Sequence, residues 1–189
     1  LSSAASDVYK RQIVHNKVFI TDPNYENETA GGGLFVSFDK VSEQSAQLKL
    51  DAHIRNTSGK SFGGKIIYEL YDRDGKRVLS KETGLSVSKG LAKQTSCKVT
   101  VETPHLWSPD SPYLYKLHIY IKDKAGNTID GYYRRIGIRS IEFKGKDGFW
   151  LNGKPYPYPL MGANRHQDFA VIGNALPNSC LLYTSDAAD

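Results

Sequence analysis

The sequence predicts a mainly β protein whose centre is an immunoglobulin-like β-sandwich. Polar and apolar residues alternate along several short segments, as they do in strands that expose one face and bury the other. Turn-forming residues separate these segments roughly every ten residues, and no long amphipathic helix interrupts them over residues 13–179. Two antiparallel sheets packed face to face would bury strands of this kind, and we expect about seven of them within about 100 residues.

The clearest strand is expected over residues 46–55, where Ala, Leu, Leu, Ala and Ile alternate with Gln, Lys, Asp, His and Arg. Residues 56–60, 72–75 and 125–127 are rich in residues that favour tight turns. In chain order, the expected strands cover residues 34–38, 46–55, 65–71, 76–80, 95–102, 113–122 and 128–138. The two cysteines and intervening tryptophan that mark antibody domains are absent, so only the general sandwich architecture is predicted.

Two stretches lie outside this pattern. Residues 21–33 end in three successive glycines and are expected to form a loop or linker. Residues 149–154 are typical of a hairpin with an Asn-Gly turn. Pro157 and Pro159 then exclude a helix, and a short apolar run over residues 160–163 leads into a polar cluster at 164–168.

The composition of the chain excludes several classes of protein. Its 189 residues include 25 Lys and Arg against 20 Asp and Glu, a net charge of +5. These cations are spread among acids, so nucleic-acid binding is not expected. No apolar run approaches the roughly 20 residues that span a bilayer. Two cysteines exclude a disulfide scaffold, and no pair of His or Cys has the spacing of metal ligands.

Several polar residues that could carry chemistry are better explained by structure. Cys97 lies on the apolar phase of its strand, so we expect a buried small hydrophobe rather than a nucleophile. His53 and His118 fall on the polar phase of theirs and are expected at the surface. The sequons at Asn27 and Asn56 would matter only in a secreted eukaryotic chain.

The two ends of the chain are expected to be artefacts. One back-translation of residues 180–189, reverse-complemented and shifted by one base, translates into residues 3–11. The ends therefore resemble the two orientations of one DNA adapter of the kind used in sequencing libraries. We exclude residues 1–12 and 180–189 from the fold argument and expect a gene fragment truncated on both sides. The compartment then stays open among cytoplasm, periplasm and secretion.

Four segments, in order along the chain, carry a resemblance to a known family. They read LWSPDSPYLY at 106–115, RIGIR at 135–139, FWLNGKP at 149–155 and GANRHQD at 162–168. These segments are similar to the LWSPxxPYLY, RxGIR, FxLNGKP and GxNRHxD segments of glycoside hydrolase family 2. The resemblance covers roughly residues 34–179, and the β-galactosidase branch of the family is the most similar.

The resemblance implies a domain layout. The family places a jelly-roll domain first, then an immunoglobulin-like sandwich, then a catalytic (β/α)8 TIM barrel. Residues 13–33 would be the end of the jelly-roll or its linker, and residues 34–139 the sandwich. Residues 140–179 would be the hairpin and first strand of a truncated barrel.

The resemblance also implies an activity and a set of site residues. Family members are retaining exo-glycosidases, and a terminal β-galactoside is the expected substrate. Both catalytic glutamates would lie on later barrel strands, so this chain is expected to contain no catalytic residue and to be inactive alone. His166 and Asp168 would contact the sugar, whereas Asn164 and Arg165 would support that loop from behind.

No metal ligand or cofactor is expected within this stretch, although the resemblance implies that the complete enzyme binds Mg²⁺ or Na⁺ and forms a homo-oligomer. Two alternatives remain from other classes of protein. One is a non-catalytic immunoglobulin-like module of a larger surface protein, which would not be followed by the 149–168 segment. The other is a carbohydrate-binding module, which needs exposed aromatic residues in a row; Tyr120, Tyr132 and Tyr133 are the candidates.

Overall fold

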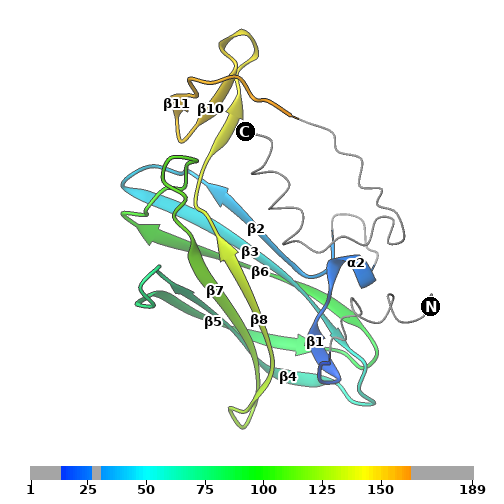
Figure 1. Ribbon diagram of the computed structural model, residues 1–189. Coiled ribbons are helices and arrows are strands. Elements are labelled where there is room, and N and C mark those ends of the chain that lie inside the picture. The colour runs from blue at the N-terminus through cyan, green and yellow to red at the C-terminus, as the bar shows by residue number, and fades with distance from the viewer. Residues whose placement is uncertain (1–13, 27–30, 163–189) are drawn as a thin grey trace, which may run out of the picture. The chain divides into compact units, whose positions relative to one another are not determined.

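The computed structural model describes residues 14–26 and 31–162, and nearly all the regular structure in these ranges is β (Figure 1). The strands are β1 (Val18–Ile20), β2 (Leu34–Asp39), β3 (Ser45–Asn56), β4 (Phe62–Tyr71), β5 (Arg77–Val87), β6 (Ala92–Glu102), β7 (Tyr115–Asp123), β8 (Thr128–Ile136), β9 (Ile141–Phe143), β10 (Phe149–Leu151) and β11 (Lys154–Pro155). A four-residue helix, α2 (Pro23–Glu26), and a 3-10 turn, η1 (Gly145–Asp147), complete the elements. No helix among the described residues is long and apolar enough to cross a membrane. The mainly β class that the sequence predicts is confirmed by this set of strands.

The first sheet is organised around the long strand β3. β6 pairs antiparallel with β3 along one edge, from Ser45 opposite Glu102 to Arg55 opposite Ala92. Along the other edge, β2 pairs with residues 47–52 of β3 and β1 pairs with residues 54–56. β1 lies within residues 13–33, which we assigned to the end of a preceding domain or its linker. This segment thus supplies a strand to the first sheet. Three residues are too few to show an alternating pattern, so the sequence did not reveal that strand.

The second sheet has the strand order β5-β4-β7-β8, and all its pairs are antiparallel. β5 was expected over residues 76–80 but continues to Val87. Most of its residues are exposed, and only Leu85 and Val87 near its end are buried. An edge strand with so few apolar positions lacks the pattern from which its length could be predicted.

The core lies between the two sheets and is made of the alternating residues that the sequence predicts. Leu48, Leu50 and Ile54 of β3 are fully buried. The fully buried residues that face them from the second sheet are Ile66, Tyr68 and Leu70 of β4 and Leu117, Ile119 and Ile121 of β7. Cys97 is buried with them, as expected.

One hydrogen bond ties the edges of the two sheets together. The backbone N–H of Ile20 in β1 donates to Oδ2 of Asp130 in β8 over 2.7 Å. Burial raises the pKa of the Asp130 carboxyl above its usual value, although the Ile20 N–H partly offsets this by stabilising the charged form. β1 therefore contacts both sheets at one edge of the sandwich.

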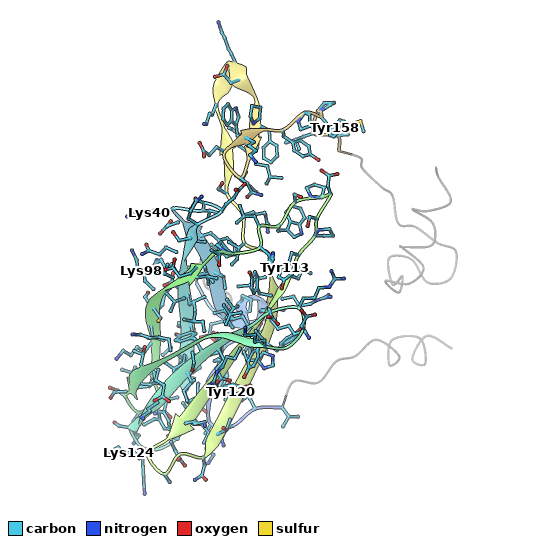
Figure 2. All side chains as sticks on the ribbon, turned by 90° about the vertical axis from the view of Figure 1, so that its left-hand side faces the viewer. Lys40, Lys98, Tyr113, Tyr120, Lys124 and Tyr158 are labelled. Carbon is cyan, nitrogen blue, oxygen red and sulfur yellow. The ribbon has the colours of Figure 1, made fainter. Side chains whose placement is uncertain are left out.

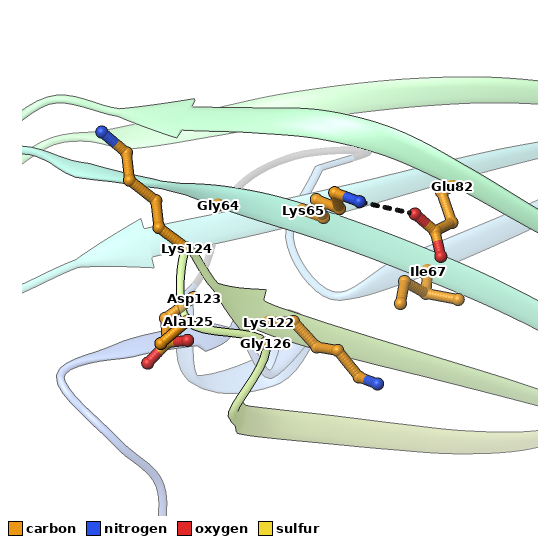
Figure 3. Close-up of a pocket in the computed structure, with 9 residues that line it drawn as sticks. All are labelled: Gly64, Lys65, Ile67, Glu82, Lys122, Asp123, Lys124, Ala125 and Gly126. Carbon is orange, nitrogen blue, oxygen red and sulfur yellow. Dashed lines mark hydrogen bonds and ion pairs between the residues drawn. The ribbon is translucent and has the colours of Figure 1, made fainter.

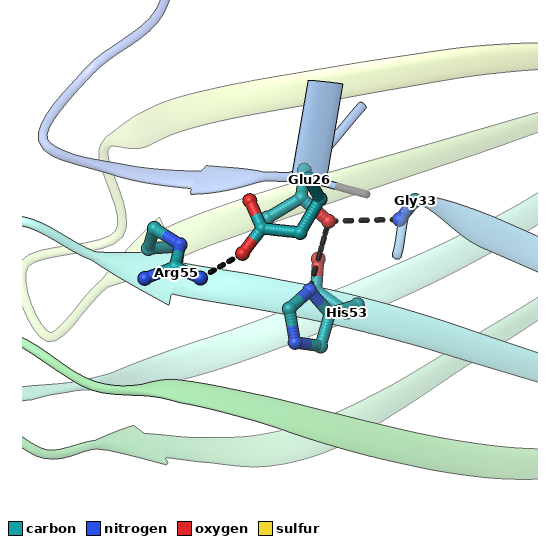
Figure 4. A network of polar contacts seen from close by, with 5 residues as sticks. Glu26, Gly33, His53 and Arg55 are labelled. Carbon is teal, nitrogen blue, oxygen red and sulfur yellow. Dashed lines mark hydrogen bonds and ion pairs between the residues drawn. The ribbon is translucent and has the colours of Figure 1, made fainter. Parts of the chain in front are cut away.

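The segment after β1 covers part of the outer face of the first sheet (Figure 4). The Thr21 hydroxyl accepts a hydrogen bond from the Gly33 N–H over 2.8 Å and contacts Nδ1 of His53 at 2.9 Å. Arg55 pairs with the carboxylate of Glu26, whose side chain is only 7% exposed. His53 is therefore buried rather than at the surface, and our expectation for it was wrong. Alternation places a side chain on the outer face but cannot show that another segment covers it.

The Asn56 sequon has a structural role in this fold. The Asn56 side chain is fully buried, and its amide donates to the carbonyl oxygens of Lys60 and Val87 over 2.9 and 3.1 Å. Its Oδ1 accepts from the Ser58 N–H over 2.9 Å. An amide in this position is not accessible for glycosylation once the sandwich has formed.

After the sandwich, the chain forms a small antiparallel sheet of strand order β9-β10-β11. Asn152 and Gly153 connect β10 to β11, and both have positive φ angles, 52° and 75°. Two successive residues of positive φ are typical of a two-residue type I′ turn, which Asn-Gly favours. The hairpin predicted over residues 149–154 is therefore confirmed.

Candidate functional site

The four residues predicted at the sugar site, Asn164, Arg165, His166 and Asp168, lie outside the described residues, so their roles stay predictions. The three preceding motifs are described. They lie far apart in the sequence, at 106–115, 135–139 and 149–155, yet they meet where the hairpin joins the end of the sandwich. We refer to this region as the junction.

Trp107 lies at the centre of the junction. Its backbone N–H donates to the Ile138 carbonyl over 2.8 Å. Its ring packs so closely on Gly137 that a Cβ at that position would lie 2.8 Å from two ring atoms. The Arg139 guanidinium covers the ring, with Cζ 4.9 Å from its centroid. The RIGIR motif thus requires Gly137 because the Trp107 ring packs directly on it. The last arginine of the motif, Arg139, covers the same ring.

Asn152 connects the hairpin to this cluster through three hydrogen bonds. Its backbone N–H donates to the Ser140 carbonyl over 3.0 Å, and its Oδ1 accepts from the Ser140 N–H over 3.1 Å. Its Nδ2 donates to the Trp107 carbonyl over 3.0 Å. Asn152 therefore forms the tight turn and holds the hairpin to the sandwich, which explains why Asn occupies this position of the FWLNGKP motif.

An open groove of about 490 Å³ lies beside the junction. Its walls include His105 and Asp110 from the β6–β7 connection and Lys154 and Tyr156 from the hairpin. Lys154 pairs with Glu43 at 3.4 Å, but both side chains are more than 70% exposed, so this pair contributes little stability. The groove offers contacts for a chain segment but no arrangement of catalytic groups.

Several of the described glutamates pair with neighbouring side chains. Glu69 is half-buried rather than solvated, because it accepts a hydrogen bond from the Tyr71 hydroxyl over 2.8 Å and pairs with Arg77 at 3.1 Å. This hydrogen bond raises the pKa of Tyr71. Glu82 and Glu142 pair with lysines across and along their strands. Within residues 14–26 and 31–162, no three His, Cys, Asp or Glu side chains gather as metal ligands would.

His118 lies on the outer face of the second sheet, but it is less solvated than we expected. The ring is half-buried between Tyr71 and Tyr133, and its Nδ1 lies 3.0 Å from the Tyr120 hydroxyl. Of the three tyrosines considered for a carbohydrate-binding module, Tyr120 and Tyr133 share this outer face of the second sheet. Tyr132 instead packs against the core. Sequence alternation predicts which residues share a face. Which aromatic rings lie next to one another also depends on the pairing of β4, β7 and β8, which the sequence pattern does not show.

Comparison with known proteins agrees with the motifs at the junction. The sequence pattern of "Glycosyl hydrolases family 2" matches residues 33–139. A β-glucuronidase of Formosa agariphila is 28% identical over 174 residues, covering 90% of this chain and 17% of the relative. A β-galactosidase of Thermoanaerobacter pseudethanolicus is 32% identical over 154 residues, covering 80% of this chain and 19% of the relative.

Solved structures are similar as well. The crystal structure of a Bacteroides uniformis β-glucuronidase superposes with a TM-score of 0.75 at 27% identity, covering 89% of this chain and 20% of that one. The chain therefore spans about a fifth of the length of the relatives that it matches.

Proposed function

The chain belongs to glycosyl hydrolase family 2, and from this premise we propose that it is one part of a longer retaining β-glycosidase. The observation that carries the proposal is the junction, where Trp107, Gly137 and Asn152 fix a hairpin at the end of a family 2 sandwich. In this proposal residues 34–139 are the sandwich, and residues 140–179 begin the catalytic barrel. Residues 13–33, which contribute β1 to the first sheet, connect the sandwich to a preceding domain.

The chemistry of the complete enzyme would follow from two carboxylates about 5–5.5 Å apart, one acting as nucleophile and the other as acid and base. We propose that both are glutamates on barrel strands beyond this chain, so that the chain alone has no glycosidase activity. The sandwich and the hairpin would position the first strand of the barrel. Any bound Mg²⁺ or Na⁺ and any homo-oligomer contact would likewise belong to the complete enzyme.

His166 and Asp168 are the residues of this chain that we propose at the sugar. An imidazole N–H can donate to a sugar hydroxyl, and this contact accelerates the reaction only if it is stronger in the transition state than in the bound substrate. Asp168 would line the wall of the same pocket. Asn164 and Arg165 would hold the loop that carries both residues.

We propose a terminal β-galactoside as the substrate, with a β-glucuronide as the second candidate. The LWSPDSPYLY and GANRHQD segments are similar to those of β-galactosidases, which favours the first. The second is supported by relatives that are β-glucuronidases. The two sugars differ in the configuration at C4 and in the carboxylate that a glucuronide carries at C6. Their discrimination would therefore depend on the contacts to the C4 hydroxyl and on whether a cation lies near C6.

The test compares this chain with the complete protein on p-nitrophenyl β-galactoside and p-nitrophenyl β-glucuronide. We expect turnover by the complete protein, preferentially of the galactoside, and none by the 189-residue chain. In the complete protein, His166→Ala should lower kcat/KM at least tenfold, an effect of about 1.4 kcal/mol on the transition state. Hydrolysis by the purified chain alone, or full activity of the His166→Ala variant, would contradict the proposal.

A further inference from the structure

The outer face of the second sheet gathers aromatic and basic side chains that the sandwich core does not use. Cross-strand neighbours share a face of a sheet, so the pairing of β4, β7 and β8 defines the surface. Ile67 lies opposite Tyr120, and Tyr71 lies opposite Lys116. On the next strand, Tyr133 lies opposite His118 and Arg135 opposite Lys116. We call the surface formed by Ile67, Tyr71, Lys116, His118, Tyr120, Tyr133 and Arg135 the platform.

The aromatic rings of the platform hold one another in place. The His118 ring packs at a steep angle against Tyr71 and Tyr133, with centroid separations of 5.2 and 5.1 Å. The Tyr120 hydroxyl lies 3.0 Å from Nδ1 of His118. Tyr133 is nevertheless 49% exposed. The platform therefore presents an ordered aromatic surface to solvent, and binding would cost little additional side-chain entropy.

Glycine keeps one ring of the platform accessible. Gly131 of β8 lies directly opposite Tyr120 of β7. A Cβ at Gly131 would lie 3.6 Å from Cδ1 of the Tyr120 ring, an ordinary contact distance. Packing therefore does not demand glycine there, yet its presence leaves this side of the ring uncovered. A flat apolar ligand surface can approach the ring at this point.

The platform continues into a hollow of about 520 Å³ beside the β7–β8 turn (Figure 3). Lys122 and Lys124 line this hollow together with the Lys65–Glu82 ion pair. Figure 2 labels Tyr120 and Lys124, which belong to the same strand and its following turn. An aromatic surface and an aqueous hollow are thus adjacent. The charged walls of the hollow hold three lysines, Lys65, Lys122 and Lys124, against the carboxylates of Glu82 and Asp123.

The charge of this surface is unbalanced. Glu82 and Glu69 already pair with Lys65 and Arg77. The third carboxylate, Asp123, accepts hydrogen bonds from the Asn127 backbone N–H and side-chain amide. Among the described residues, the cations that make no ion pair here are Lys116, Lys122, Lys124 and Arg135. Unpaired cations around an aromatic surface produce a positive potential that attracts anions.

We propose that the platform binds an acidic saccharide, one that carries carboxylate or sulfate groups. A sugar ring would lie on Tyr120 and Tyr133 through its C–H face, and its acidic groups would meet Lys122 and Lys124. The choice of a saccharide rests on the glycosidase function proposed above. A single-stranded nucleic acid fits less well, because successive bases stack on ring faces. The His118 ring instead meets Tyr71 at 62°, Tyr133 at 76° and Tyr120 at 47°.

Isothermal titration calorimetry on the 189-residue chain tests this proposal. The probes are a hexagalacturonate, which carries carboxylates, a sulfated dextran oligosaccharide, a neutral cellohexaose and a dT12 oligonucleotide. We expect at least one acidic saccharide to bind at least tenfold more tightly than cellohexaose and dT12, and the preferred acid group identifies the ligand. Binding should weaken as salt rises from about 0.05 to 0.5 M, since screening lengths shorten.

Variants locate the site. Lys122→Ala with Lys124→Ala should weaken acidic-saccharide binding about tenfold, and Tyr120→Ala should do the same. Gly131→Val should also weaken binding, because its side chain would cover the open side of the Tyr120 ring. The matched control is Lys93→Ala with Lys98→Ala, which removes two exposed lysines from β6 in the other sheet and should leave binding unchanged.

The two lysines of the hollow lie at an exposed strand end and turn, so their removal tests binding even if Tyr120→Ala impairs folding. Equal affinity for neutral and acidic saccharides, preference for dT12, no binding by any probe, or an unaltered affinity in the Lys122/Lys124 variant would each overturn the proposal. Turnover by the complete protein is a separate measurement, so failure here is distinguishable from failure of the proposed function.

Discussion

The outer faces of the two sheets share the same alternating sequence pattern but have opposite environments. On the first sheet, Thr21 and Gly33 cover part of the end of β3, and His53 is buried beneath their polar contacts. On the second sheet, Tyr133 and several lysines stay exposed. The comparison teaches that a polar phase along a strand predicts which side a residue faces, whereas a covering segment decides whether it meets water.

The largest effect should come from the hydroxyl that connects the cover to the first sheet. Thr21→Val keeps the shape of the side chain but leaves the Gly33 N–H and the His53 ring without their partner. Leaving a buried donor unpaired costs about 2–3 kcal/mol of the free energy of unfolding. Urea unfolding of the variant and the original chain measures this difference in the free energy of unfolding.

The matched change on the uncovered face is Tyr71→Phe, which removes one hydroxyl bond to Glu69. Water can replace that bond, so we expect a much smaller loss of stability than for Thr21→Val. If the two variants lose equal stability, the distinction between a covered and an uncovered face is wrong.

Two ion pairs, one on each sheet, test the same comparison, and we expect their coupling energies to be of intermediate size. Glu26 pairs with Arg55 under the cover, where the side chains are 7% and 36% exposed. Lys65 pairs with Glu82 on the second sheet, where they are 62% and 53% exposed. Double-mutant cycles with alanine should give a coupling of about 1–2 kcal/mol for the first pair and about 0.5 kcal/mol or less for the second. Raising the salt concentration should reduce the second coupling more, and the reverse order would contradict the assignment.

The smallest effect should appear in the acid range, at Asp51 of the first sheet. Burial alone would raise the pKa of this carboxyl, but hydrogen bonds from Lys49 and Ser96 and the Lys49 charge outweigh burial and lower it. A lowered pKa stabilises the fold above the unfolded value of about 3.9, and this stabilisation is lost as pH falls through the folded value.

Asp51→Asn should therefore be less stable than the original chain at pH 7, and the difference should shrink below about pH 4. Thermal unfolding between pH 2.5 and 7 measures it, with Asp110→Asn on an exposed loop as the control. A difference that is constant across this range would show that the charge of Asp51 does not stabilise the fold.

The four motifs differ in what the sequence could say about them. The Asn-Gly turn follows directly from local backbone preference, because both residues tolerate positive φ. The reason for Gly137 is visible only when Trp107, thirty positions earlier, packs against it. The motifs showed family membership, but only the folded chain shows that three of them form one contact between the sandwich and the hairpin.

The sequence by itself determined the sandwich and its core, because a period of two along a strand fixes which side chains face inward. Leu48, Leu50, Ile119 and Cys97 are buried for that reason. The tertiary structure alone decided the burial of His53, the aromatic neighbours of His118 and the place of β1 beside β3. Each of these depends on contact between segments distant in the chain, which local alternation does not encode.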